Sequence, residues 1–96
     1  MEMEQAVIER LRTVIDPETG VDVMRMRLIE DLRVEEGSGQ VSYRFRPSSP
    51  LCPLAVHLAL AIRDAVAGVP GVKKQEVEVV GYVGADDLNE LLAEPA

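Results

Sequence analysis

The start of the chain carries a helical pattern of apolar positions. Four apolar side chains recur three or four residues apart: Met3, Val7, Leu11 and Val14. This spacing places them on one face of an amphipathic helix, which we predict over residues 2–15. The helix is expected to end within residues 16–20, because Pro17 disfavours helical geometry in the residue before it and Gly20 permits a sharp turn.

Two later segments alternate between apolar and polar residues, which is the pattern of strands with one buried face. Over residues 28–35 the apolar side consists of Leu28, Leu32 and Val34, and the polar side of Asp31, Arg33 and Glu35. Over residues 40–46 the inward residues are Val41, Tyr43 and Phe45. A glycine-containing turn at residues 36–39 joins the two segments, so we predict a β-hairpin.

The second half of the chain predicts a helix, a strand and a short helix. A helix follows the Pro-Ser-Ser-Pro break at residues 47–50 and runs to about Ala67, with an inner stripe of Leu54, Leu58, Ala61, Ile62 and Ala65. A third strand is expected over residues 72–80 and a short helix over residues 86–92. The order α-β-β-α-β-α predicts a two-layer α/β (α+β) fold, with helices packed on a small mixed sheet. Residues 1–96 are expected to form one domain.

Charge and cysteine content narrow the classes of partner. The chain has 10 basic and 17 acidic residues among 96, a net charge of −7, which disfavours nucleic acids and membrane surfaces as partners. The single cysteine cannot form an internal disulfide, and a reduced compartment fits it best. Because the acidic N-terminus lacks the pattern of a signal peptide, we expect a cytoplasmic protein.

The one cysteine, Cys52, lies where the second strand gives way to the second helix. Helix N-termini carry unpaired N–H groups and a partial positive charge, which favour a thiolate over a thiol. Cys52 is therefore a candidate ligand for iron or for a cluster, with Ser48 and Ser49 as supporting residues in the same loop. The alternative is a small apolar residue packed under the helix start. Since clusters usually take four thiolates, a single cysteine indicates transient carriage.

We expect no enzymatic activity of the chain itself. A cysteine nucleophile needs a base within hydrogen-bond reach. The only histidine, His57, follows Cys52 by five positions, which places it about 140° away around a helix. His57 is therefore expected to be a half-exposed helix residue.

Two further groups of residues are candidates for supporting roles. Asp16, Glu18 and Asp22 lie in one loop, where they either hold the turn or supply oxygen ligands to a metal ion. On the second helix, apolar side chains and one arginine line the side opposite the inner stripe. We predict a partner interface there, unless the first or last helix covers it: Val56, Leu60 and Arg63.

Five short motifs, taken in their order and spacing, resemble one protein family. They are Asp16-Pro17-Glu18, Asp22-Val23, Leu28-Ile29, Ser48-Ser49-Pro50-Leu51-Cys52-Pro53 and Gly68-Val69-Pro70-Gly71-Val72. The family is that of iron–sulfur cluster assembly domains, or metal–sulfur cluster biosynthesis proteins. It includes SufT-type proteins, the oxygenase maturation protein PaaD and eukaryotic cytosolic iron–sulfur targeting factors. The resemblance covers roughly residues 5–80. Met26-Arg27 stands where the family usually has Leu-Gly.

The resemblance implies an iron–sulfur-assembly-like fold, often dimeric, and a role in delivering or inserting clusters into client proteins. It also implies that Cys52 is the main functional residue and that Asp16 and Glu18 belong to the family signature. We therefore expect a maturation factor that carries a transient iron–sulfur cluster or iron, holds no permanent cofactor, and meets client apoproteins or assembly machinery. The alternative is an accessory interaction subunit of an oxygenase or assembly complex that carries no metal.

Overall fold

The computed structural model describes residues 2–93, so Met1 and residues 94–96 of the predicted domain lie outside the described part. Its elements are α1 (Glu2–Leu11), β1 (Ile29–Glu35), β2 (Gln40–Phe45), α2 (Ala55–Ala67), β3 (Lys74–Val79) and α3 (Ala85–Ala93). The predicted order α-β-β-α-β-α is confirmed. Within residues 2–93 no helix has the length and apolar character needed to cross a membrane.

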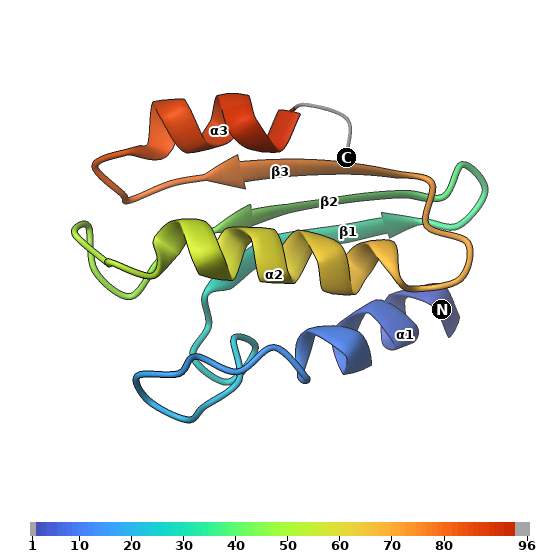
Figure 1. Cartoon of the computed structure of the whole chain (residues 1–96). Helices are drawn as coiled ribbons and strands as arrows, with labels where there is room; N and C mark the ends of the chain where they lie inside the picture. Colours follow the sequence, from blue (N-terminus) through green and yellow to red (C-terminus); the bar gives the residue numbers. More distant parts are fainter. Residues whose placement is uncertain (1, 94–96) are drawn as a thin grey trace.

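The three strands form one mixed sheet in the order β1-β2-β3. β1 and β2 are the antiparallel hairpin that the alternation predicts, and β2 and β3 are parallel, joined through α2. Helices α1 and α2 lie against the same face of the sheet, while α3 lies along β3 (Figure 1). The loops that precede α2 and α3 lie at the same end of the molecule, which sets the position of the candidate site.

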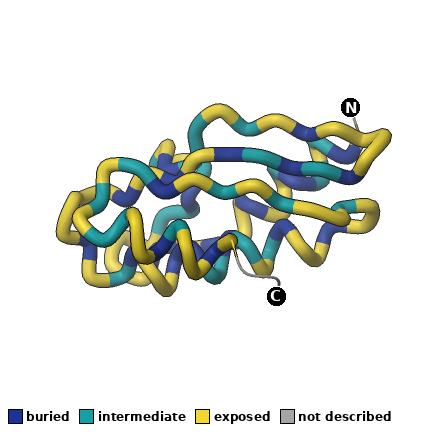
Figure 2. Tube along the Cα trace, turned by 90° about the horizontal axis from the view of Figure 1, so that it is seen from above, coloured by how far each residue is buried: buried dark blue, intermediate teal, exposed yellow. Residues whose placement is uncertain are grey.

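The core lies between the sheet and helices α1 and α2, and buried positions alternate along the strands (Figure 2). Its largest fully buried side chains are Phe45, Leu11, Leu58, Ile62, Val7, Val23, Val41 and Val66. The inward set predicted for β2 is confirmed, because Val41, Tyr43 and Phe45 are all buried. Two aromatic side chains, Phe45 and Tyr43, therefore lie in an otherwise aliphatic core.

The first helix is shorter than residues 2–15. It ends at Leu11, where the N–H of Thr13 donates to the carbonyl of Arg10 at 3.0 Å in a tighter turn. Thr13, Val14 and Ile15 are β-branched, which lowers their helix propensity. Val14 instead reaches the core from an extended segment, in which its carbonyl accepts the N–H of Val23 at 3.0 Å.

The alternation in β1 is interrupted by a β-bulge that the sequence pattern did not predict. The pairing register shifts between Glu30 and Arg33, and Asp31 has a φ of 53°. Ile29 pairs with Phe45 before the bulge, and Val34 pairs with Val41 after it. The extra residue thus changes which positions face inward, as bulges do. Leu28 is buried but lies just before the strand.

The buried stripe of α2 is rotated relative to the prediction. The buried residues are Ala55, Leu58, Ala59, Ile62 and Val66, whereas Ala61 and Ala65 are only half-buried. Leu54 is the residue that caps the helix. The difference arises because small alanines on every side of this helix leave its apolar face poorly defined by sequence.

Helix α3, predicted over residues 86–92, protects the outer edge of β3. The side-chain amide of Asn89 accepts the N–H of Val79 at 2.7 Å and donates to the carbonyl of Val79 at 3.2 Å. Leu88 and Leu92 anchor the helix through their buried side chains. The amide therefore takes the place of a neighbouring strand at this position.

Arg27 adopts the left-handed conformation that glycine favours, with a φ of 58°. Left-handed geometry costs a residue with a Cβ roughly 1–2 kcal/mol, while glycine loses about 0.5–1 kcal/mol of entropy on folding. Arg27→Gly is therefore expected to raise the free energy of unfolding by about 0.5–1 kcal/mol, measured by urea denaturation. The control Arg25→Gly, in the same loop without a positive φ, should not raise it. An equal gain in both variants would contradict this explanation.

Candidate functional site

Cys52 lies in the loop between β2 and α2, three residues before the helix begins at Ala55. Ser49 organises this loop. Its hydroxyl accepts the N–H of Leu51 at 3.2 Å, and its carbonyl accepts the N–H of Cys52 at 3.1 Å. The carbonyl of Cys52 accepts the N–H of Ala55 at 3.3 Å. These short-range bonds place the cysteine at the entrance of α2, where the sequence positions it.

The side chain of Cys52 is covered rather than open, with 6% of its surface exposed. It is nevertheless near the surface, because Leu51 and Pro53 on either side of it are exposed. The start of α2 beside it carries no side-chain cap and no acidic residue in its first turn. Cys52 is thus buried within a surface loop, which would have to change conformation for the sulfur to become accessible.

A second loop, between β3 and α3, is hydrogen-bonded to the cysteine loop. The N–H of Val83 donates to the carbonyl of Pro50 at 2.9 Å, which holds the segment between β3 and α3 against the segment before α2. Val83 is itself 71% exposed. Sequence reasoning treated this segment only as a connection. An apolar side chain between the turn glycines Gly81 and Gly84 was the signal that could have drawn attention to it.

The acidic residues of the 16–27 loop are engaged in holding that loop. Asp16 is buried, and its Oδ1 accepts the N–H of Glu18 at 2.8 Å. The Oδ2 of Asp22 accepts the N–H groups of Met24 and Arg25 at 3.1 and 3.0 Å. In the described range 2–93, no group of three or more His, Cys, Asp or Glu could hold a metal ion. The structural role of Asp16 and Asp22 thus has direct support, and a ligand role for them does not.

A pair of substitutions separates these two roles of Asp16. Asp16→Asn keeps an oxygen acceptor for the N–H of Glu18, so its stability should change little. Asp16→Ala removes the acceptor and should lower the free energy of unfolding by about 1–3 kcal/mol. Thermal and urea unfolding measure both. If Asp16→Asn folded normally but lost client maturation in cells, the carboxylate would have a role beyond the turn.

The predicted partner interface on α2 is partly covered. Leu60 is half-buried against the core, and Arg63 donates from Nη1 to the carbonyl of Leu92 at 3.4 Å. The end of α3 therefore covers this part of the surface. Val56 is 41% exposed, and a partner contact there stays a prediction. His57 beside it is exposed, more so than expected.

Two linked, partly buried side-chain hydrogen bonds between the sheet and α2 were not predicted from the sequence. The hydroxyl of Tyr43 donates to Oε1 of Gln75 at 3.0 Å, and Nε2 of Gln75 donates to the carbonyl of Arg63 at 2.9 Å. Burial raises the pKa of Tyr43, and the nearby charge of Arg63 opposes that rise only in part. Tyr43 therefore stays neutral and holds β2, β3 and α2 together.

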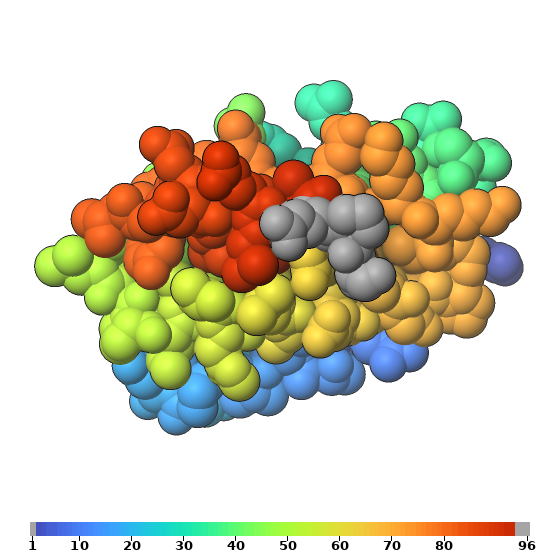
Figure 3. Space-filling model, turned by 45° about the horizontal axis from the view of Figure 1, so that its top comes forward, coloured from blue at the N-terminus to red at the C-terminus, as the bar shows by residue number. Residues whose placement is uncertain are grey.

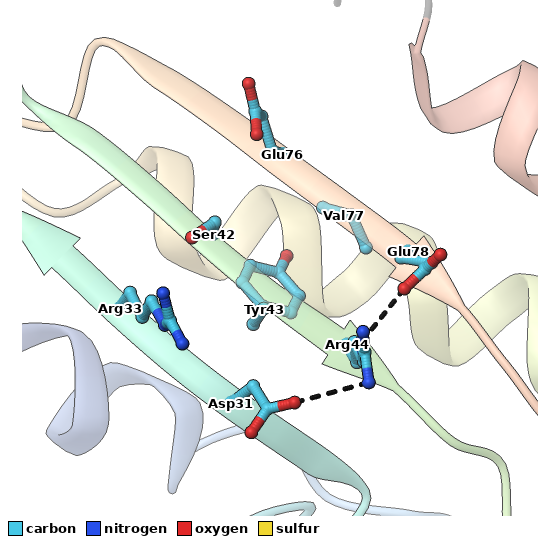
Figure 4. A pocket seen from close by; sticks show the side chains of 8 residues that line it. All are labelled: Asp31, Arg33, Ser42, Tyr43, Arg44, Glu76, Val77 and Glu78. Atoms are coloured by element: carbon cyan, nitrogen blue, oxygen red, sulfur yellow. Dashed lines mark ion pairs between the residues drawn. The ribbon is translucent and has the colours of Figure 1, made fainter.

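A hollow lies on the open face of the sheet, and Cys52 is not among the residues that line it. It has a volume of about 520 Å³, and Arg44 lies in it between Asp31 and Glu78 (Figure 4). Arg44 pairs with Asp31 at 3.4 Å and with Glu78 at 2.9 Å. These exposed charges neutralise one another and add little stability. Because Arg44, at the centre of the hollow, is already paired with two carboxylates, the Cys52 loop remains the stronger candidate site.

The sequence matches the family model described as iron–sulfur cluster assembly protein over residues 4–79. The fold is similar to the crystal structure of a Bacillus anthracis domain of unknown function. The TM-score is 0.73 and the identity 30%, over 82% of this chain and 74% of that one.

The chain is similar in sequence to three relatives of different length. An uncharacterised Methanocaldococcus jannaschii protein is 37% identical, with 98% of both chains covered. The Bacillus subtilis Fe–S protein maturation auxiliary factor YitW is 35% identical over 81% of this chain and 79% of its own. An iron–sulfur cluster carrier protein of Deinococcus radiodurans is 32% identical over 86% of this chain but only 23% of its own length. The chain belongs to the iron–sulfur cluster assembly protein family.

Proposed function

We propose that this protein is an iron–sulfur maturation factor that passes a cluster or iron to client apoproteins, with the sulfur of Cys52 as a transient ligand. One observation carries the proposal: the chain's only thiol lies at the entrance of α2, within the region that matches the family. The name of the Bacillus subtilis relative, a maturation auxiliary factor, supports the same role.

The transfer step requires ligands from outside the chain. Clusters are commonly held by four thiolates, and this protein offers one. The proposal is therefore that the client's cysteines or a small thiol complete the ligand set, and that the cluster moves as cargo. The protein acts as a carrier without enzymatic activity, and we place it in the cytoplasm.

Opening of the Cys52 loop is part of this proposal, because 6% exposure is too little for a cluster to reach the sulfur. The loop is held by the two Ser49 contacts and by the bond between Pro50 and Val83. Segments held by few bonds at the surface open locally at low cost compared with global unfolding. A client that pulls Leu51 outward would uncover the neighbouring sulfur.

A second candidate function is an adaptor that binds assembly partners and carries no metal. The burial of Cys52 favours it, since a covered small side chain also fits a packing role. The two functions differ in what they predict for purified protein. A carrier should bind iron and sulfide when reconstituted anaerobically, whereas an adaptor should bind neither.

The test combines a deletion strain with anaerobic chemistry. Deleting the gene should lower the specific activity of iron–sulfur enzymes in cells while their protein levels stay constant. Anaerobic reconstitution followed by iron and sulfide analysis should show metal bound to the wild type and little to Cys52→Ser. Full client activity in the deletion strain would refute the maturation role, and equal metal in both proteins would refute the ligand role of Cys52.

A further inference from the structure

Exposed apolar side chains gather at one end of the molecule. In the described part of the chain, the exposed large apolar residues are Ile15, Leu51, Val56, Val83 and Leu91. Leu51, Val56 and Val83 belong to the segments where α2 and α3 begin, and they are 73%, 41% and 71% exposed. We call these three residues the docking patch. Exposed apolar side chains on neighbouring segments are candidates for an interaction site.

The docking patch is continuous with the cysteine loop. The bond from the N–H of Val83 to the carbonyl of Pro50 holds the two loops side by side, and Leu51 precedes Cys52 directly. The space-filling view shows the atoms of the two segments in contact at the same end, in yellow-green and orange (Figure 3). A partner seated on the patch would therefore contact the loop that contains Cys52.

The charges beside the docking patch are acidic and free to meet a cation. Asp86 and Asp87 are exposed in the first turn of α3, and neither takes part in an ion pair within residues 2–93. Arg46, whose side chain lies against Gly81, is already paired with Glu30 at 3.1 Å. The patch thus combines an apolar surface with unpaired negative charge, which complements lysine or arginine.

We propose that the docking patch binds a segment of the client iron–sulfur protein in which apolar side chains are flanked by lysine or arginine. The identity of the partner as a client rests on the proposed function. The apolar side chains of the segment cover Leu51, Val56 and Val83, and its basic residues pair with Asp86 and Asp87. The patch is small, and small interfaces give weak, transient complexes, which suits release after transfer.

Photo-crosslinking in cells of the source organism tests this assignment. A photoreactive p-benzoylphenylalanine replaces Leu51, and a matched variant carries it in place of Ile15, which is 48% exposed outside the patch. Mass spectrometry then identifies the crosslinked peptides. The Leu51 position should capture peptides of iron–sulfur proteins that carry lysine or arginine beside apolar residues. The Ile15 position should capture none of them.

Additional variants test whether the crosslink depends on the charges of Asp86 and Asp87. Asp86→Asn combined with Asp87→Asn should lower the crosslink yield about 2- to 5-fold, in line with exposed ion pairs. The proposal would be overturned if the crosslinks joined copies of this chain or captured only peptides without basic residues. It would also be overturned if both positions gave equal crosslinks, or if neither gave any. Cys52→Ser, measured for both crosslink yield and client maturation, separates the docking site from the ligand role. If it keeps both crosslinks and client maturation, the ligand role of Cys52 fails while the docking site stands.

Discussion

Replacing Cys52 by serine is expected to lower the activity of iron–sulfur client enzymes to the level of a strain that lacks the gene. Serine is close to cysteine in size but binds iron poorly, so the substitution removes the proposed ligand with little change in volume. Cys52→Ala should have the same effect. The measurement is client specific activity in the complemented deletion strain, at matched protein levels.

The control must separate lost chemistry from lost stability, because Cys52 is buried. Ala59→Ser also places a hydroxyl at a buried position of α2, where Ala59 is 1% exposed. It should lower stability but keep client activity, provided that the protein still accumulates. If Cys52→Ala supports maturation as well as the wild type, then Cys52 has only a packing role. The adaptor function would in that case be the better description.

Replacing Phe45 by alanine is expected to destabilise the fold strongly. Phe45 is fully buried, pairs with Ile29 on β1 and with Val79 on β3, and is the only phenylalanine. Truncations of this kind cost about 3–5 kcal/mol, because they remove apolar contacts and leave a cavity. Since native proteins have about 5–15 kcal/mol in total, this substitution should remove a large share of the free energy of unfolding.

Urea denaturation and thermal unfolding measure this effect. Leu91→Ala is the matched control, because Leu91 is a large apolar residue that is 41% exposed on α3. Its free energy of unfolding should change by less than about 0.5 kcal/mol. A loss below about 2 kcal/mol for Phe45→Ala would show that the core closes around the missing ring.

The sequence allowed prediction of those parts of the fold that depend on local patterns. Alternating residues define β2, and the turn glycines define the hairpin, because side-chain periodicity and turn geometry are local properties. The position of Cys52 before α2 also follows from local signals, since Pro47, Pro50 and Pro53 interrupt regular structure there. These features need no knowledge of what packs against them.

The features that could not be predicted depend on contacts between distant segments. The bulge at Asp31 lets both Ile29 and Val34 face the core, which no strict alternation encodes. Cys52 is 6% exposed although its neighbours Leu51 and Pro53 are exposed, and its loop is bonded to the distant segment that contains Val83. Burial of a side chain is set by tertiary packing. The location of the thiol before α2 could therefore be predicted from the sequence, but its exposed fraction could not.

The side-chain amide of Asn89 has a consequence for how copies of this protein can associate. Strand edges invite addition of a strand from another molecule, which leads to sheet-extended dimers or to aggregation. At Val79 both backbone groups already have partners, so an incoming strand would first have to expel the amide and lift α3 from the sheet. Self-association by continuing the sheet past β3 is therefore disfavoured, and a dimer of this chain would have to use other surfaces.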